Sequence, residues 1–295
     1  MSATEEKGSY TAVGLLLASL TLAACGGSSN SSERTSFDGA RAMALVRSQV
    51  AVGPRPAGSP QLRRLATRLR AMLPDGTFEP FPSTGPQQGL RNIVGVLPGR
   101  PPAILIGAHY DTQYRPKGFV GANDSAAGTA ALIELARDLP SGLPADHREI
   151  RFVLFDGEEA GPGCRDRDFQ YCALRGSRAY AAAHPGQVGD MILLDYIANR
   201  GAQFPRETNS TPELWAQLRL AAEQVGTEEL FPDTTQTPII DDHIPFLDQR
   251  IPSIDLIDWS YPYKNGDQDT LDKLDPAVLG KVGETVERLV SNLNG

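Results

Sequence analysis

The stretch ILIGAHYD at residues 104–111 changes abruptly from apolar residues to an imidazole and a carboxylate. A second stretch, FVLFDGEEA at residues 152–160, ends in the same way with a Glu-Glu pair. Short apolar runs of this kind are typical of strands buried on both faces of a parallel sheet. Open α/β sheets place their sites at the carboxyl ends of such strands. We therefore expect His109, Asp111 and the glutamate pair to lie together at one sheet edge.

The rest of the chain alternates helical and strand segments. Helices are expected at 37–52, 61–73, 125–138, 176–183, 211–225 and 275–293, with a short one near 242–248. Strands are expected at 92–97, 103–108, 150–155, 191–195 and 253–257, and the first two, joined by a Pro-rich turn, are expected to pair. This order predicts one α/β domain with a mixed, mostly parallel sheet covered by helices on both faces.

The acidic and imidazole side chains favour a metal site. Carboxylates and neutral histidine are ligands that zinc binds at about 2.0–2.2 Å. In the pair Glu158 and Glu159, one carboxylate can bind the metal while the other moves a proton. Each residue has a plainer alternative: a solvated loop acid, a hydrogen-bonded histidine or, for Asp124 before a helix rich in small residues, an N-cap. With Asp156 nearby, however, three clustered acids would repel one another unless a cation lay among them.

Seven motifs in order resemble a known family. They are AHYDT at 108–112, GANDSAAGTAALIELAR at 121–137, FDGEEAG at 155–161, GSRAYA at 176–181, LLDYI at 193–197, DDHIPFL at 241–247 and DTLDKL at 269–274. Together they resemble the M28-type zinc aminopeptidases and, more closely, the animal-like glutaminyl-peptide cyclotransferases, which also occur in bacteria. The resemblance implies the α/β/α sandwich of the zinc exopeptidases.

The same resemblance implies roles for individual residues. It makes Asp124 and Glu159 zinc ligands, with His109 completing a set, and Glu158 the general acid/base. The aspartate matching Asp195 is a second-metal ligand in the peptidases and a proton-network residue in the cyclotransferases. Asp241 matches a member of the cyclotransferases' hydrogen-bond network, and His243 is expected to orient its loop rather than bind metal.

The chain departs from the family in the segment YPYKNGD at 261–267. Asn265 stands where the relatives have a zinc-ligating histidine, and Lys264 replaces an aromatic pocket residue. An amide oxygen is a poorer zinc donor than imidazole. Three outcomes stay open: zinc binds through His109, Asp124 and Glu159, or Asn265 or Asp267 supplies an oxygen ligand, or the protein is a metal-poor, weakly active relative.

Three functions follow, in order of preference. The first is cyclisation of an N-terminal glutamine of a peptide or protein, with one zinc ion and Glu158 passing a proton from the α-amine to departing ammonia. The second is an aminopeptidase, in which Glu158 activates water. The third is a non-catalytic lipoprotein that binds peptides. Trp259 and Tyr263 are candidate substrate-binding residues, whereas Trp215 is expected to pack its helix on the sheet.

The N-terminal region is typical of targeting rather than of folded structure. Residues 1–25 contain an apolar stretch, too short to span a membrane, followed by LAACG, which looks like a bacterial lipobox with Cys25 as the acylated residue. Residues 26–35 are interpreted as a tether, and residues 36–295 as the catalytic domain. We therefore expect an exported protein, lipid-anchored to the bacterial cell envelope. The acidic residues at positions 5 and 6 depart from the usual positive start, and a short core helix or disordered segment is the alternative.

Cysteine content and charge complete the sequence analysis. With Cys25 lipidated, Cys164 and Cys172 remain within one loop and are expected to form a disulfide in an exported compartment. The net charge is −8, and we expect no cluster of lysine or arginine and no nucleic-acid partner.

Overall fold

The computed structural model describes residues 1–5, 8, 37–83 and 87–295. Residues 1–5 and 8 belong to a first unit, Met1–Ser31, and contain no helix or strand. The second unit, Ser32–Gly295, contains the fold. The predicted signal peptide, the acylated Cys25 and the tether lie outside the described residues, apart from the first few positions. No helix of the described part is long and apolar enough to cross a membrane.

A six-stranded sheet runs through the centre of this unit in the order β1-β2-β4-β3-β5-β8. The strands are β1 (Thr77–Pro80), β2 (Arg91–Leu97), β3 (Arg100–His109), β4 (Arg148–Phe155), β5 (Val188–Leu194) and β8 (Ser253–Leu256), and β6 (Arg206–Glu207) and β7 (Thr235–Gln236) form a separate small pair. Strands β4, β3, β5 and β8 are parallel, whereas β2 is antiparallel to β4 and β1 to β2. The predicted mixed, mostly parallel sheet is confirmed.

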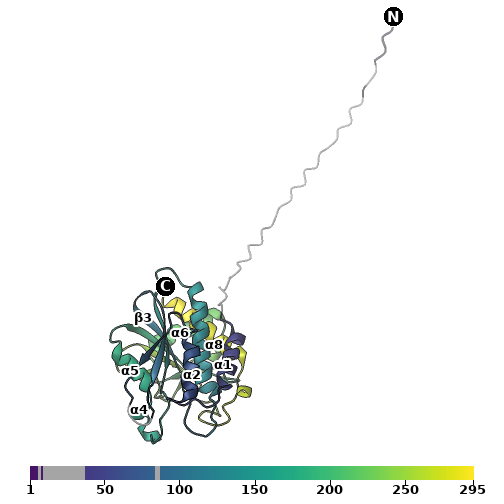
Figure 1. Ribbon diagram of the computed structural model, residues 1–295. Coiled ribbons are helices and arrows are strands. Elements are labelled where there is room, and N and C mark those ends of the chain that lie inside the picture. Colours follow the sequence, from purple (N-terminus) through teal and green to yellow (C-terminus); the bar gives the residue numbers. More distant parts are fainter. Residues whose placement is uncertain (6–7, 9–36, 84–86) are drawn as a thin grey trace. The chain divides into compact units, whose positions relative to one another are not determined.

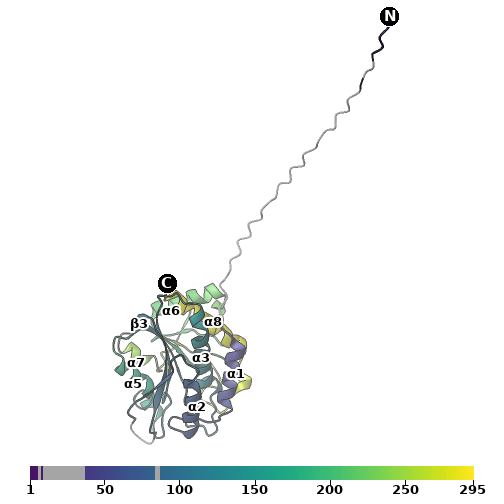
Figure 2. The same cartoon turned by 45° about the horizontal axis from the view of Figure 1, so that its top comes forward.

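Helices cover both faces of the sheet, as predicted (Figure 1). They are α1 (Gly39–Val50), α2 (Pro60–Arg70), α3 (Gly128–Asp138), α4 (Phe169–Cys172), α5 (Arg175–Ala183), α6 (Pro212–Val225), α7 (Ile244–Leu247) and α8 (Pro276–Asn292), with short 3-10 turns at Leu139–Ser141, Asp166–Asp168, Glu228–Leu230 and Leu271–Lys273. The apolar side chains of α1, α2, α3, α6 and α8 form the larger core on one face. Helices α5 and α7 cover the other face (Figure 2).

The expected pairing of strands 92–97 and 103–108 is wrong. Strand β4 lies between them, antiparallel to β2 and parallel to β3. The connection contains Pro98, Pro101 and Pro102, and none of these has an N–H to donate to a hairpin ladder. The chain instead passes to the start of β4, where the N–H of Arg100 donates to the carbonyl of His147 at 2.9 Å.

Two further differences from the predictions are local. The short edge strand β1 was not predicted from the sequence. Helix α3 begins at Gly128 rather than at 125, because an irregular turn over Ala122–Ala127 precedes it, in which Ser125 has φ +121°. Neither this turn nor α3 has a side-chain cap, so Asp124 does not serve as an N-cap.

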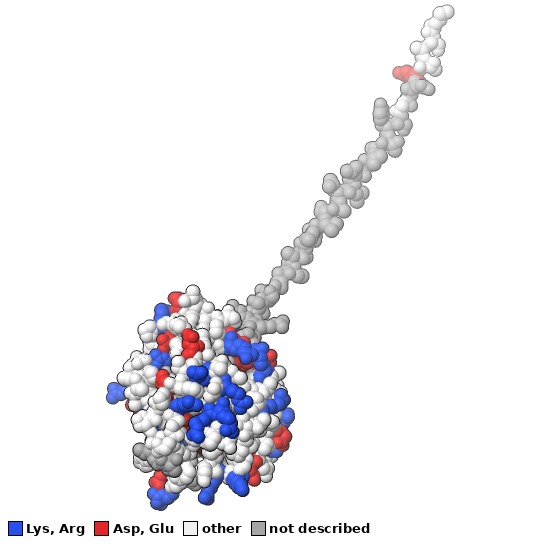
Figure 3. Space-filling view, in the orientation of Figure 1, with Lys and Arg blue, Asp and Glu red and all other residues white. Residues whose placement is uncertain are grey.

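Basic side chains gather on one face of the molecule, over α2 (Figure 3). The expectation of no arginine cluster is therefore wrong. The sequence contains no long basic run, because buried leucine and alanine residues interrupt the arginines of α2 after the pair Arg63-Arg64. The helical repeat brings these arginines onto one side.

The start of α3 depends on a close approach to the sheet. A Cβ atom added to Gly128 would lie 2.2 Å from the carbonyl oxygen of Leu194, the last residue of β5. We expect Gly128→Ala to lower the free energy of unfolding by about 1–3 kcal/mol, because backbone at a packed junction must shift. Urea denaturation measures this difference. Gly142→Ala, whose nearest atom would be 4.0 Å away, is the matched control; equal stability of the two variants would contradict the prediction.

Candidate active site

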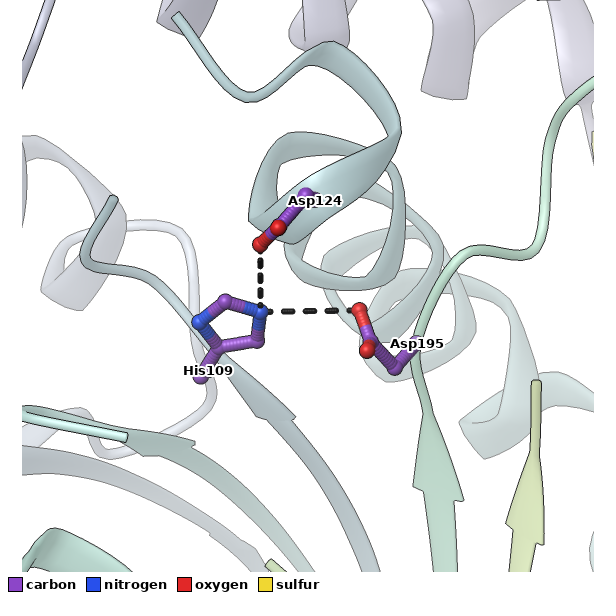
Figure 4. Close-up of side chains that lie close together, drawn as sticks. All are labelled: His109, Asp124 and Asp195. Atoms are coloured by element: carbon purple, nitrogen blue, oxygen red, sulfur yellow. Dashed lines mark ion pairs between the residues drawn. The ribbon is translucent and has the colours of Figure 1, made fainter. Parts of the chain in front are cut away.

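Three side chains from separate segments meet at the carboxyl ends of β3 and β5 (Figure 4). His109 ends β3, Asp195 follows β5, and Asp124 lies in the turn before α3. The Nε2 atom of His109 is 3.3 Å from Oδ1 of Asp124 and 3.5 Å from Oδ1 of Asp195. All three residues are buried. The structure thus brings the predicted ligands His109 and Asp124 together and adds Asp195 to them.

The other nitrogen of the same imidazole faces a second pair of acids. Nδ1 of His109 is 3.6 Å from Oε2 of Glu158 and 3.7 Å from Oδ1 of Asp111, and it has no hydrogen-bond partner among the described residues. Asp111 also accepts hydrogen bonds from the backbone N–H groups of Glu158 (3.2 Å) and Glu159 (3.3 Å). Asp111 therefore fixes the turn that carries both glutamates.

Asn265 lies on the far side of Asp124 from His109. The hydroxyl of Tyr196 donates to Oδ2 of Asp124 at 2.5 Å and is 3.1 Å from Oδ1 of Asn265. The amide of Gln113 donates to the same two oxygens, at 3.2 Å for Asp124. The two oxygens of Asp124 thus differ: Oδ1 faces the histidine, whereas Oδ2 is occupied by donors. Neither Gln113 nor Tyr196 was predicted, although Gln113 directly follows the motif AHYDT and Tyr196 lies within the motif LLDYI.

Asp269 and Arg55 hold the turn that carries Asp124. The carboxylate of Asp269 accepts hydrogen bonds at 3.0 Å from the backbone N–H groups of Asn123 and Asp124. The buried guanidinium of Arg55 donates to the carbonyls of Val120 and Gly121. Sequence analysis missed both roles; the motif DTLDKL contains Asp269, but nothing in it indicates the contact. These two residues fix the backbone at both ends of the segment 120–124 and so fix the position of Asp124.

This arrangement fits a zinc ion. Within the described residues, two groups have ligand atoms that all lie within 4.8 Å of one another: His109 with Asp124 and Asp195, and His109 with Glu158 and Glu159. With Nε2 on the metal, Nδ1 would face Asp111, the carboxylate support common to metal-bound histidines. The predicted set divides between the two groups: His109 belongs to both, Asp124 to the first and Glu159 to the second. The result is a buried His/Asp/Glu metal site consistent with zinc.

Burial and crowding of like charge shift the acids of the site. Burial, with nearby carboxylates adding to it, raises the pKa of Glu158 and of Glu159 well above the ordinary value. Burial also raises the pKa of Asp195 to about 6 and that of Asp241 to about 7. Burial alone would lower the pKa of His109, but hydrogen bonds to the surrounding aspartates raise it well above its usual value. The site therefore stabilises a cation or a proton among its acids.

The segment at 241–247 packs behind the site. The buried His243 lies between two acids, with Nε2 3.2 Å from Oε1 of Glu207 and Nδ1 3.9 Å from Oδ2 of Asp255. In the described part of the chain it belongs to neither group of candidate metal ligands. The hydroxyl of Ser177 donates to the neighbouring Asp242. The contacts of His243 with Glu207 and Asp255 suit a residue that orients this segment.

A cavity of about 400 Å³ opens above these side chains. Its lining comprises Gln113, Asp124, Glu158, Glu159, Phe169, Asp195, Tyr196, Pro238, Ile239, Ile240, Asp241, Trp259 and Asn265. Of the two predicted substrate-binding aromatics, Trp259 lines the cavity, whereas Tyr263 does not and packs against Tyr261. The predicted disulfide Cys164–Cys172 is present, and it closes the loop that contributes Phe169. Trp215 packs in the core, as expected.

Comparison with known proteins assigns the family. Residues 92–290 match the profile of Peptidase family M28. The chain belongs to family M28. This M28 chain is 28% identical over 252 residues to a glutaminyl-peptide cyclotransferase of Gloydius blomhoffii, covering 69% of the chain and 67% of that protein. The crystal structure of Acidobacteriales bacterium glutaminyl cyclase superimposes with a TM-score of 0.78 and 29% identity, over 88% of this chain and 95% of that one. The crystal structure of a leucine aminopeptidase precursor of Bacteroides thetaiotaomicron superimposes with a TM-score of 0.77 and 26% sequence identity, over 87% of this chain and 97% of that one.

The position of Asn265 makes zinc affinity testable. We expect Asn265→His to bind an additional zinc ion that the parent does not bind, because imidazole is a better zinc donor than an amide oxygen and would lie on the Oδ2 side of Asp124, away from His109. Zinc titration of chelator-treated protein measures the stoichiometry and the affinity, and thermal unfolding follows binding, since zinc at 100 times its dissociation constant adds about 2.7 kcal/mol of stability. Asn265→Ala should bind zinc no better than the parent, and Asp124→Asn should bind zinc more weakly. Unchanged zinc binding by Asp124→Asn would exclude this site.

Proposed function

We propose that the protein is a zinc-dependent glutaminyl-peptide cyclotransferase, which converts an N-terminal glutamine into pyroglutamate and releases ammonia. The proposal rests mainly on Glu158. Its carboxyl group lines the cavity, lies 3.6 Å from His109 and has a raised pKa. A carboxyl group tuned in this way can exchange protons near neutral pH. The similarity to glutaminyl cyclases, in sequence and in fold, supports the same assignment.

The chain's own residues would carry the proton transfers. As the substrate's α-amine attacks its γ-carboxamide carbon, Glu158 accepts a proton from the amine. Glu158 then gives that proton to the nitrogen that leaves as ammonia when the carbon–nitrogen bond of the carboxamide breaks. When bound, zinc would polarise the γ-carbonyl. The cavity would hold the two ends of a flexible glutamine close together. Asp195 and Asp241 also line it and would share protons with Glu158.

We infer that one zinc ion serves this reaction. The ligand atoms of His109, Asp124 and Asp195 gather on one side of the site. On the other side, Oδ2 of Asp124 is already bound by Tyr196 and Gln113, and Asn265 supplies an amide in place of a histidine. Cyclisation has an internal nucleophile, so it needs no second metal to activate water. Peptide or protein N-termini are the proposed substrates, with Trp259 on the cavity wall as a contact for them.

An aminopeptidase is the second candidate. The group His109, Asp124 and Asp195 favours it, because the aspartate that matches Asp195 is a metal ligand in the peptidases. The similarity to a leucine aminopeptidase precursor points the same way. In that reaction Glu158 would take the proton from the attacking water.

A product assay separates these functions. With a glutaminyl peptide and zinc-loaded protein, we expect ammonia without free amino acid. Glu158→Gln should reduce the rate by about 10²–10⁴-fold with zinc content unchanged, since a general acid/base contributes that much. Glu213→Gln, an exposed acid in α6, is the control. Release of amino acids from general peptides would establish the peptidase instead. If zinc-loaded protein forms neither product, both enzyme functions are excluded and only the peptide-binding lipoprotein remains.

We also propose that the protein is exported and lipid-anchored to the bacterial cell envelope through Cys25. The LAACG motif supports this, and the disulfide Cys164–Cys172 suits an oxidising compartment. We expect Cys25→Ala to move the protein from the membrane to the soluble fraction, because a lipid chain on that cysteine would be its attachment. Fractionation with immunodetection measures this. Full retention of Cys25→Ala in the membrane would overturn the anchor.

A further inference from the structure

Five arginines form one exposed basic surface, which we name the arginine face. It comprises Arg63, Arg64, Arg68 and Arg70 of α2 together with Arg91 of β2. The opposite side of α2 is buried through leucine and alanine side chains, so the four helix arginines occupy its solvent side. Figure 3 shows these basic side chains over α2 with few acids among them. The surface spans about 16 Å, the length of an 11-residue helix.

The arginine face lacks balancing acids. In the parts of the chain that the structure describes, none of its five arginines forms an ion pair, whereas Arg41 and Arg148 each pair with a carboxylate. The contacts that hold it are neutral. The guanidinium of Arg91 lies 3.6 Å and that of Arg70 5.0 Å from the ring centroid of Phe78. Like charges are therefore held side by side, on a protein whose net charge is −8.

The arginine face is separate from the active site. None of its residues lines the cavity that contains Glu158 and Asp124. Proton transfer and metal binding therefore give no reason for it. An anionic partner other than the substrate would explain why these arginines lie together.

We propose that the arginine face binds the surface of an anionic phospholipid bilayer. Phosphate groups spread over a plane match guanidinium groups spread along a helix. Met72, an exposed apolar side chain directly after α2, suits contact with the interfacial region of a bilayer. Nucleic acid is a poorer match, because the acidic remainder of the protein would repel an extended polyanion.

The start of the domain supports this partner, and this step rests on the proposed anchor. Phe37 is buried, and its N–H donates to Glu287 at 3.3 Å, so the domain is fixed from that residue onward. Cys25 precedes Phe37 by twelve residues, which span at most about 42 Å. An acylated Cys25 would therefore keep the domain within that distance of a bilayer. At such a distance, weak contacts by several arginines act together.

Vesicle sedimentation tests the arginine face apart from the anchor. The full chain with Cys25→Ala, which cannot be acylated there, is mixed with vesicles of phosphatidylcholine alone or with about 30% phosphatidylglycerol. We expect preferential binding to the anionic vesicles that weakens at high salt. Adding Arg64→Gln, Arg68→Gln and Arg70→Gln should lower that preference at least about tenfold, since each arginine contributes about fivefold.

A matched triple variant controls for net charge. It carries Arg137→Gln, Arg167→Gln and Arg200→Gln, which are exposed arginines away from α2, and it should bind as the parent does. Thermal unfolding of both triple variants should match that of the parent. Equal binding to both vesicle types, equal loss in the two triple variants, or binding to duplex DNA but not to anionic vesicles would overturn the proposal.

Discussion

The concentration of negative charge at the carboxyl edge of the sheet is the constraint on which the site depends. The ends of β3, β4 and β5 bring Asp111, Glu158 and Asp195 to a common buried region. Carboxylates buried together repel strongly unless they bind protons or a cation. Burial is the main cause of the raised pKa values of Glu158 and Asp195, and neighbouring carboxylates add to it. A metal ion would relieve it and would at the same time leave one carboxyl group free for proton transfer.

Such a cluster can exist only if the backbone around it is held firmly. Asp269 binds two consecutive N–H groups before α3, and Arg55 binds the carbonyls just before them. Arg55 also places a buried positive charge near Asp124, Asp269 and Asp111. Burial lowers the pKa of Arg55 to about 10, but it stays charged at neutral pH. Charge balance and backbone positioning are therefore supplied by the same residue.

The sequence predicts the parts of this structure that depend on local patterns. Apolar runs gave the buried strands, and the residues that follow them, His109 and the glutamate pair, do converge at the sheet edge. The order of the strands was partly wrong, because proline removes the hydrogen bonds of the expected hairpin after β2. Residues Gln113 and Asn265 are far apart in sequence, and their contact depends on how distant loops fold together. No local pattern encodes such a contact.

Asn265 lies beside two hydrogen-bond donors that also contact Asp124. The amide of Gln113 donates to Asn265 and to Oδ2 of Asp124, and the hydroxyl of Tyr196 donates to Oδ2 with Asn265 3.1 Å away. Two hydrogen-bond donors therefore occupy the side of Asp124 that faces Asn265. A donor pointing at that position disfavours a cation there. The other oxygen of Asp124 keeps an imidazole and a carboxylate beside it. The two oxygens of Asp124 thus face different surroundings: Oδ1 faces candidate metal ligands, and Oδ2 faces hydrogen-bond donors. That division suits a chemistry with an internal nucleophile, which needs no second metal to activate water.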